Sequence, residues 1–146
     1  MEILSKNLTE TADLAKSFLN RLKGNFTVAT VLALGGDLGS GKTTFTQFLA
    51  KELGIDNYIT SPTFIIEKKY LIKNHPHFKQ LVHIDCYRLN EATEMIHLDW
   101  EELIHDANNL IVVEWPKRIE SILPKESIKI EFEFVDENTR KILIKE

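Results

Sequence analysis

Eight residues, "GDLGSGKT", have the types and spacing that bind phosphate. Gly36, Gly41, Lys42 and Thr43 satisfy the pattern G-x-x-x-x-G-K-[ST], and they stand between an apolar run and an amphipathic one. In a chain of this length, such a match arises by chance in well below ~1% of sequences of average composition. The pattern therefore predicts a phosphate-binding loop (P-loop) between a strand and a helix, rather than a glycine-rich turn with an incidental lysine.

Each part of this loop has an expected role. Backbone N–H groups of residues 38–44 would surround a β-phosphate, and the start of the next helix adds its positive dipole end. Lys42 would bridge β- and γ-phosphate oxygens, the Thr43 hydroxyl would hold Mg²⁺, and Thr44 would reach the α-phosphate. We therefore predict that ATP is bound by Asp37, Leu38, Gly39, Ser40, Gly41, Lys42, Thr43 and Thr44.

A P-loop also needs an acidic residue on the metal side, usually at the end of a neighbouring apolar strand. Glu114 ends "LIVVE", and Asp85 ends the alternating segment "LVHID". If both strands are parallel to the strand before the loop, both carboxylates emerge at the same edge of the sheet. We predict that Glu114 is the metal ligand, with Lys42 and Asp85 as further catalytic residues. Asp85 would orient the attacking water or bind the metal through water.

Two other segments have open interpretations. The hydroxyl-rich "TSPTF", residues 60–64, is either a nucleotide-sensing switch or a polar turn before a strand. Trp115 precedes Pro116 and is either a packing residue or a functional stacking residue. Cys86 has no catalytic surroundings in the sequence and is expected to be a small buried hydrophobe.

The elements that must position these residues follow from periodicity and turn signals. A first helix is expected over 7–24, with Thr9 as its cap and Gly24 as its left-handed terminator. The other expected elements are a strand at 26–36, a helix at 42–54, strands at 63–72 and 80–89, short helices within 91–108, a buried strand at 109–116 and a hairpin over 127–146. We predict an α/β fold, a P-loop NTPase three-layer sandwich whose mixed sheet has parallel core strands and a C-terminal antiparallel hairpin.

Composition narrows the class of protein. The 146 residues suit a single P-loop ATPase domain, 1–146, and the formal net charge of −4 disfavours bulk electrostatic binding to nucleic acid. One cysteine excludes an internal disulfide, and no stretch approaches the roughly 20 apolar residues of a membrane span. We expect a cytoplasmic protein that does not act at a membrane.

Three classes of P-loop protein fit the loop to different degrees. The guanine-reading N-K-x-D segment of a GTPase does not occur. A small-molecule kinase needs an arginine-bearing lid, and the arginines at 21, 88, 118 and 140 are scattered. An ATPase that acts through partners fits the short chain better. A small-molecule P-loop kinase and a nucleotide-binding module without hydrolysis stay open as alternatives.

Four segments, "GDLGSGKTTFTQ", "SPTF", "HIDCYRL" and "VVEWP", occur in an order and spacing that resemble one family closely. This is the TsaE (formerly YjeE) family, small P-loop ATPases of bacterial tRNA threonylcarbamoyladenosine synthesis. The resemblance implies binding to the carbamoyl-transferase subunit (TsaD) and its dimerisation partner (TsaB), with tRNA reached indirectly through that complex. It also implies that ATP hydrolysis keeps the complex turning over without this chain modifying tRNA itself.

The resemblance implies roles for particular residues as well. Lys42 and Thr43 would hold the phosphates and Mg²⁺, Glu114 would be the acid on the metal side, and Asp85 would belong to the hydrolysis or switch apparatus. Thr11 would lie beside the adenine. No arginine is an obvious cis-acting finger, so we expect slow hydrolysis by the isolated chain and acceleration by partners.

Overall fold

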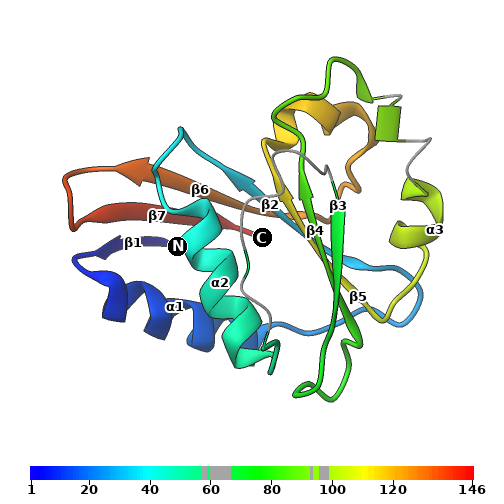
Figure 1. Cartoon of the computed structure of the whole chain (residues 1–146), viewed down its shortest axis with the longest axis horizontal. Helices are drawn as coiled ribbons and strands as arrows, with labels where there is room; N and C mark the ends of the chain where they lie inside the picture. Colours follow the sequence, from blue (N-terminus) through cyan, green and yellow to red (C-terminus); the bar gives the residue numbers. More distant parts are fainter. Residues whose placement is uncertain (57–58, 60–66, 93, 96–98) are drawn as a thin grey trace.

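The computed structural model describes residues 1–146 except 57–58, 60–66, 93 and 96–98. Its strands and helices alternate along the chain except at β3–β4 and β6–β7, where two strands follow each other (Figure 1). In order they are β1 Glu2–Ser5, α1 Leu8–Arg21, β2 Thr30–Gly35, α2 Lys42–Glu52, β3 Glu67–Leu71, β4 Gln80–Asp85, α3 Trp100–Ile104, β5 Asn109–Glu114, the 3₁₀ helix η2 Pro116–Ile122, β6 Ile128–Phe134 and β7 Arg140–Lys145.

The strands form one mixed sheet in the order β1-β7-β6-β2-β5-β4-β3. The central strands β6, β2, β5 and β4 are parallel, whereas β1, β7 and β3 pair antiparallel to their neighbours. The α/β class, the mixed sheet with a parallel core and the C-terminal β6–β7 hairpin are therefore confirmed. Strands β2 and β5 are buried along their whole length, as parallel strands covered on both faces are.

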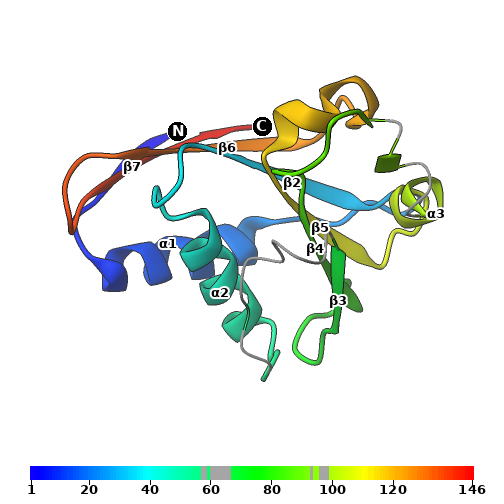
Figure 2. The same ribbon diagram turned by 45° about the horizontal axis from the view of Figure 1, so that its top comes forward.

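Helices cover the two faces of the sheet and create two apolar layers (Figure 2). On one face, α1 and α2 pack Phe18, Phe45 and Leu49 against β2, β5 and β6. On the other face, α3 and η2 pack Trp100 and Ile119 against the opposite side of the central strands. This arrangement is the expected three-layer sandwich, and it leaves the carboxyl ends of the parallel strands at one edge of the sheet.

The first helix differs from the expectation at both ends. Asn7, not Thr9, is its N-cap: the Asn7 side chain accepts the Glu10 N–H at 2.8 Å, and Glu10 accepts the Lys6 N–H in return. An asparagine caps at least as well as a threonine, so the helix begins one residue after Asn7. Gly24 is not the terminator, because the helix ends at Arg21 and Leu22 is extended.

Gly24 instead lies against a side chain. A Cβ at this position would lie 2.0 Å from the Cδ2 atom of His77, so a larger residue would have to displace the imidazole. The glycine that does end a helix in the left-handed region is Gly54, with φ 73°, after α2. The prediction for the second helix is thus confirmed at its C-terminal end.

Other sequence expectations have mixed outcomes. The strand expected at 63–72 is confirmed over β3, and it is partly exposed, but the "TSPTF" segment falls outside the described residues. Strand β1 and the 3₁₀ helix η2 were not expected. Cys86 is buried with a free thiol, in agreement with the prediction. Among the described residues, no helix is long and apolar enough to cross a membrane.

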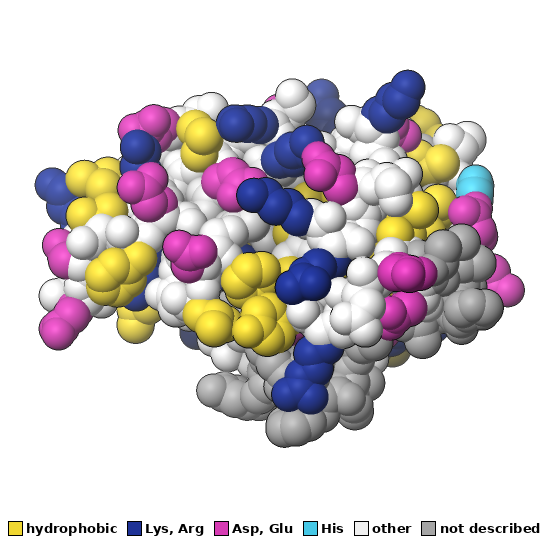
Figure 3. Space-filling model, turned by 90° about the horizontal axis from the view of Figure 1, so that it is seen from above, with side chains coloured by type: hydrophobic (Ala, Val, Ile, Leu, Met, Phe, Trp, Pro, Cys, Tyr) yellow, Lys and Arg dark blue, Asp and Glu magenta, His cyan; other side chains and the backbone are white. Residues whose placement is uncertain are grey.

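The face seen from above mixes charges of both signs (Figure 3). Lysine and arginine side chains alternate there with aspartate and glutamate, and small apolar groups lie between them. A surface of interspersed charge has no strong field of one sign with which to attract a polyanion.

Candidate nucleotide-binding site

The P-loop connects the end of β2 at Gly35 to the start of α2 at Lys42. Three of its glycines, Gly36, Gly39 and Gly41, have φ of 133°, 76° and 110°, which residues with a side chain rarely adopt. A Cβ on Gly36 would also lie 2.4 Å from the carbonyl oxygen of Phe132. These three glycines therefore allow a left-handed backbone in the loop, and the strand-to-helix position of the loop is confirmed.

The side chain of Lys42 lies folded back onto its own loop. Its Nζ donates to the carbonyl oxygens of Gly36 and Asp37, the latter at 3.0 Å, and stands 4.5 Å from the ring centroid of Trp115. Burial lowers the pKa of the Lys42 ammonium from its ordinary value, although neighbouring carboxylates, that of Glu114 first, oppose this effect. The ammonium is thus held by carbonyl groups and a π-face at the place where a phosphate would arrive.

Glu114 lies next to the loop with each of its carboxylate oxygens engaged. The Thr43 hydroxyl donates to Oε1 at 3.1 Å, and Oε2 lies 2.5 Å from Nε2 of His83. Glu114 is only 2% exposed, and His83 is fully buried. The sequence prediction paired Thr43 with Glu114 as metal ligands, and the structure brings these two side chains into contact.

Asp85 lies beside Glu114 on the neighbouring strand, since the two residues are register partners in the parallel pair β4–β5. Its Oδ1 accepts the Tyr87 N–H at 2.9 Å, which orients the carboxylate just beyond the strand end. Tyr87 in turn packs on Trp115, with ring centroids 5.0 Å apart. Trp115 has φ 58° and ends β5 abruptly, so its indole turns toward the loop.

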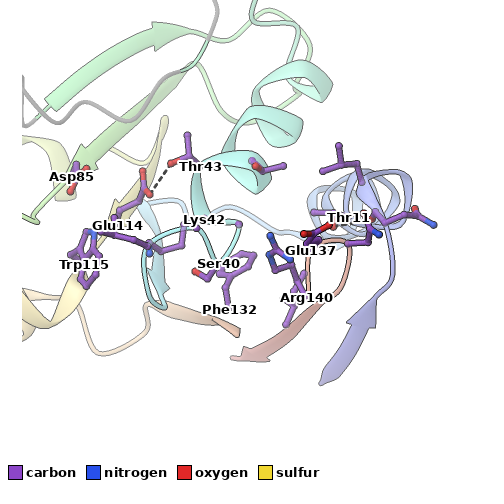
Figure 4. A pocket seen from close by; sticks show the side chains of 18 of the residues that line it. Thr11, Ser40, Lys42, Thr43, Asp85, Glu114, Trp115, Phe132, Glu137 and Arg140 are labelled. Atoms are coloured by element: carbon purple, nitrogen blue, oxygen red, sulfur yellow. Dashed lines mark hydrogen bonds between the residues drawn. The ribbon is translucent and has the colours of Figure 1, made fainter. Parts of the chain in front are cut away.

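One cavity of about 720 Å³, a size typical of small-molecule sites, is lined by Lys42, Thr43, Asp85, Glu114 and Trp115. Figure 4 shows that Asp85, Glu114 and Trp115 lie at one end, Lys42 and Ser40 in the middle, and Thr11, Glu137 and Arg140 at the other end. Of the residues predicted to bind nucleotide or catalyse hydrolysis, the cavity brings together Thr11, Leu38, Gly39, Ser40, Gly41, Lys42, Thr43, Thr44, Asp85 and Glu114.

The contribution of Asp37 to the loop is its backbone carbonyl, because its side chain does not line this cavity. Thr11 lines the far end, and its hydroxyl is engaged with that of Ser5 at 2.6 Å.

Two residues at this site were missed by sequence reasoning. Arg140 reaches the cavity from the β6–β7 hairpin, where its Nη1 donates to the Thr139 carbonyl at 3.0 Å. Nothing in its local sequence places this hairpin beside the P-loop. His83 lies two residues before Asp85, and strand alternation does put both on one face of β4. That alternation is the signal by which His83 could have been found.

The donor set at the Glu114 end fits a magnesium ion. A threonine hydroxyl and a carboxylate are hard oxygen ligands, and Mg²⁺ is commonly held by one or two such groups together with substrate phosphates. The described residues contain no cluster of three His, Cys, Asp or Glu side chains that could hold a metal by themselves.

A glycine loop between a parallel strand and a helix, with an acid on the adjacent strand, defines a nucleotide-binding protein of the P-loop class. Comparison with known proteins identifies the family. Residues 5–142 match the family model described as Threonylcarbamoyl adenosine biosynthesis protein TsaE, and the chain belongs to this family.

Individual relatives agree with this membership. The tRNA threonylcarbamoyladenosine biosynthesis protein TsaE of Bacillus subtilis is 41% identical over 112 residues, which are 77% of this chain and 66% of that protein, just under two thirds. The Aquifex aeolicus protein of the same name is 34% identical over 98% of this chain and 94% of its own length. The crystal structure of Bacillus subtilis YdiB superposes with a TM-score of 0.74 at 32% identity, covering 97% of this chain and 82% of that one.

Proposed function

We propose that this chain is a Mg²⁺-dependent ATPase, folded as one domain, in the synthesis of N6-threonylcarbamoyladenosine in tRNAs that read codons starting with adenine. The observation that carries the proposal is the 3.1 Å contact between Thr43 and Glu114 at the base of the P-loop. A hydroxyl on the first turn of the helix and an acid on the neighbouring strand are the pair that holds Mg²⁺ in P-loop NTPases. The relatives' names supply the pathway.

The side chains have separate tasks in this proposal. Lys42 exchanges the carbonyls of Gly36 and Asp37 for phosphate oxygens when nucleotide binds, because an anion is a stronger partner for a desolvated ammonium. Thr43 and Glu114 hold the metal ion, which when bound neutralises charge on the β- and γ-phosphates. Asp85, fixed by the Tyr87 N–H, orients the attacking water.

The base end of the nucleotide is assigned to the other end of the cavity. Thr11 and Arg140 lie there, on the opposite side of Lys42 from Glu114 and Asp85 (Figure 4). Arg140 is therefore badly placed to act on the γ-phosphate. This arrangement supports slow hydrolysis by the isolated chain, with TsaD and TsaB accelerating it and ATP hydrolysis driving turnover of their complex.

The experiment follows the γ-phosphate of radiolabelled ATP, with and without the TsaD–TsaB pair and tRNA. Release as free phosphate that rises with the partner pair is expected. Transfer of the label to an acceptor would favour a small-molecule kinase, and equal turnover with and without partners would reject the partner-stimulated mechanism. Bound ATP with no release under any condition would indicate a binding module without hydrolysis.

A further inference from the structure

A buried histidine lies against the proposed metal ligand. His83 is 0% exposed, Glu114 is 2% exposed, and the Nε2–Oε2 distance is 2.5 Å. Since Thr43 donates to Oε1, each oxygen of this carboxylate has its own donor. Nε2 of His83 and Oε2 of Glu114 thus share one hydrogen bond, in which the imidazole N–H is the donor when the carboxylate is ionised.

The topology of the sheet produces this contact. Asp85 and Glu114 are register partners, and His83, two residues earlier on β4, projects from the same face as Asp85. His83 is therefore the diagonal neighbour of Glu114, at a separation that long side chains bridge. Among the described residues, the other ring nitrogen of His83, Nδ1, has no hydrogen-bond partner. In the part of the chain that the structure describes, the imidazole of His83 therefore makes its hydrogen bond to Glu114.

We propose that His83 is a positioning residue for the metal site: it holds Oε2 of Glu114 so that Oε1 points to Thr43 and the metal ion. The inference rests on the proposed Mg²⁺–nucleotide site. A glutamate side chain has several rotamers, and a buried donor on one oxygen selects among them before the metal arrives. Groups that orient metal ligands in this way typically change metal affinity 10- to 100-fold when they are lost.

A merely structural histidine would behave differently. If the imidazole only fills space between the sheet and α2, replacing it lowers thermal stability and leaves metal affinity alone. If it positions Glu114, metal affinity falls even when the fold is intact. His83→Gln keeps an N–H donor at nearly the same reach, whereas His83→Leu keeps volume and removes the donor.

The test titrates Mn²⁺ into the 146-residue chain loaded with ADP and measures free Mn²⁺ by electron paramagnetic resonance. His83→Leu is expected to weaken Mn²⁺ binding 10- to 100-fold, and His83→Gln to stay within about threefold of the unmodified protein. The control is Ile84→Ala, which removes buried packing from the opposite face of the same strand and is expected to lower the melting temperature without changing Mn²⁺ affinity.

Each other outcome overturns the inference. Unchanged Mn²⁺ affinity in His83→Leu, or an equal loss in Ile84→Ala, refutes a positioning role while leaving the proposed function standing. Absence of Mn²⁺ binding by the unmodified ADP-loaded protein refutes the metal site itself, and this inference with it. If His83→Leu does not fold, His83→Asn provides the same test, because its shorter amide falls short of Glu114.

Discussion

Two substitutions of Glu114 separate its chemical role from its structural one. In Glu114→Gln, the amide oxygen can still accept from His83 and the amide nitrogen can donate to the Thr43 hydroxyl, so both contacts survive. What is lost is the negative charge that faces the metal. In Glu114→Ala both contacts disappear as well.

The expected losses of stability follow from the burial of Glu114 and His83. Glu114→Ala leaves the fully buried Nε2–H of His83 without an acceptor, which costs roughly 1–3 kcal/mol, and it adds a small cavity. Together these give about 3 kcal/mol, or a fall in melting temperature of roughly 6–12 °C for a chain of this size. Glu114→Gln should change the free energy of unfolding by less than about 1 kcal/mol. Both variants should lose Mg²⁺-dependent hydrolysis by at least about 100-fold, since losing a ligand harms the metal site more than losing its support does.

The assay pairs thermal unfolding without nucleotide with phosphate release at varied Mg²⁺. The unmodified protein is the reference for both measurements, and hydrolysis is measured with the partner pair present. A Glu114→Gln protein that hydrolyses ATP at the normal rate would show that another group holds the metal. An equally stable Glu114→Ala protein would show that the contact with His83 contributes nothing to folding.

Three further predictions test other parts of the structure. Nucleotide should draw Lys42 away from the indole of Trp115 and change tryptophan emission. Trp115→Phe should abolish this change, because the other tryptophan, Trp100, is fully buried and does not line the cavity. Burial raises the pKa of the Cys86 thiol to about 12, so at pH 8 the folded protein should react with a disulfide reagent far more slowly than the unfolded chain does. In the unfolded chain this thiol ionises near pH 9, at a lower pH than in the folded protein. The free energy of unfolding measured in urea should therefore fall above pH 9 by up to about 1.4 kcal/mol per pH unit, and Cys86→Ala should remove this pH dependence. Phe45→Ala should lower the free energy of unfolding in urea by about 3–5 kcal/mol, because the ring is fully buried and its centroid lies 5.5 Å from that of Phe132. A loss below about 1 kcal/mol would contradict the packing of α2 on the sheet.

The sequence predicted the parts of the site that depend on local pattern. The P-loop is encoded in one contiguous segment, and Glu114 and Asp85 are recognisable because each ends an apolar strand. Arg140 reaches the cavity only because β6 pairs with β2 and carries the following hairpin with it, a long-range pairing that no local signal reports. Strand β1 was missed for a similar reason: four residues with one buried side chain acquire their strand character by pairing with β7.

The order of the strands bears on the division of work that we propose for the two acids. Along the chain β4 precedes β5, but in the sheet β5 lies between β2 and β4. Glu114 is therefore one strand from the P-loop and Asp85 is two, and neighbouring strands are about 4.8 Å apart. This difference is enough for Glu114 to touch Thr43 while Asp85 stands one strand spacing further out, where the cavity opens beside Tyr87. In the proposed mechanism the nearer acid, which contacts the loop hydroxyl, holds the metal ion, and the farther acid orients the water. The insertion of β5 next to β2 thus supports Glu114 as the metal ligand and Asp85 as the residue that handles water.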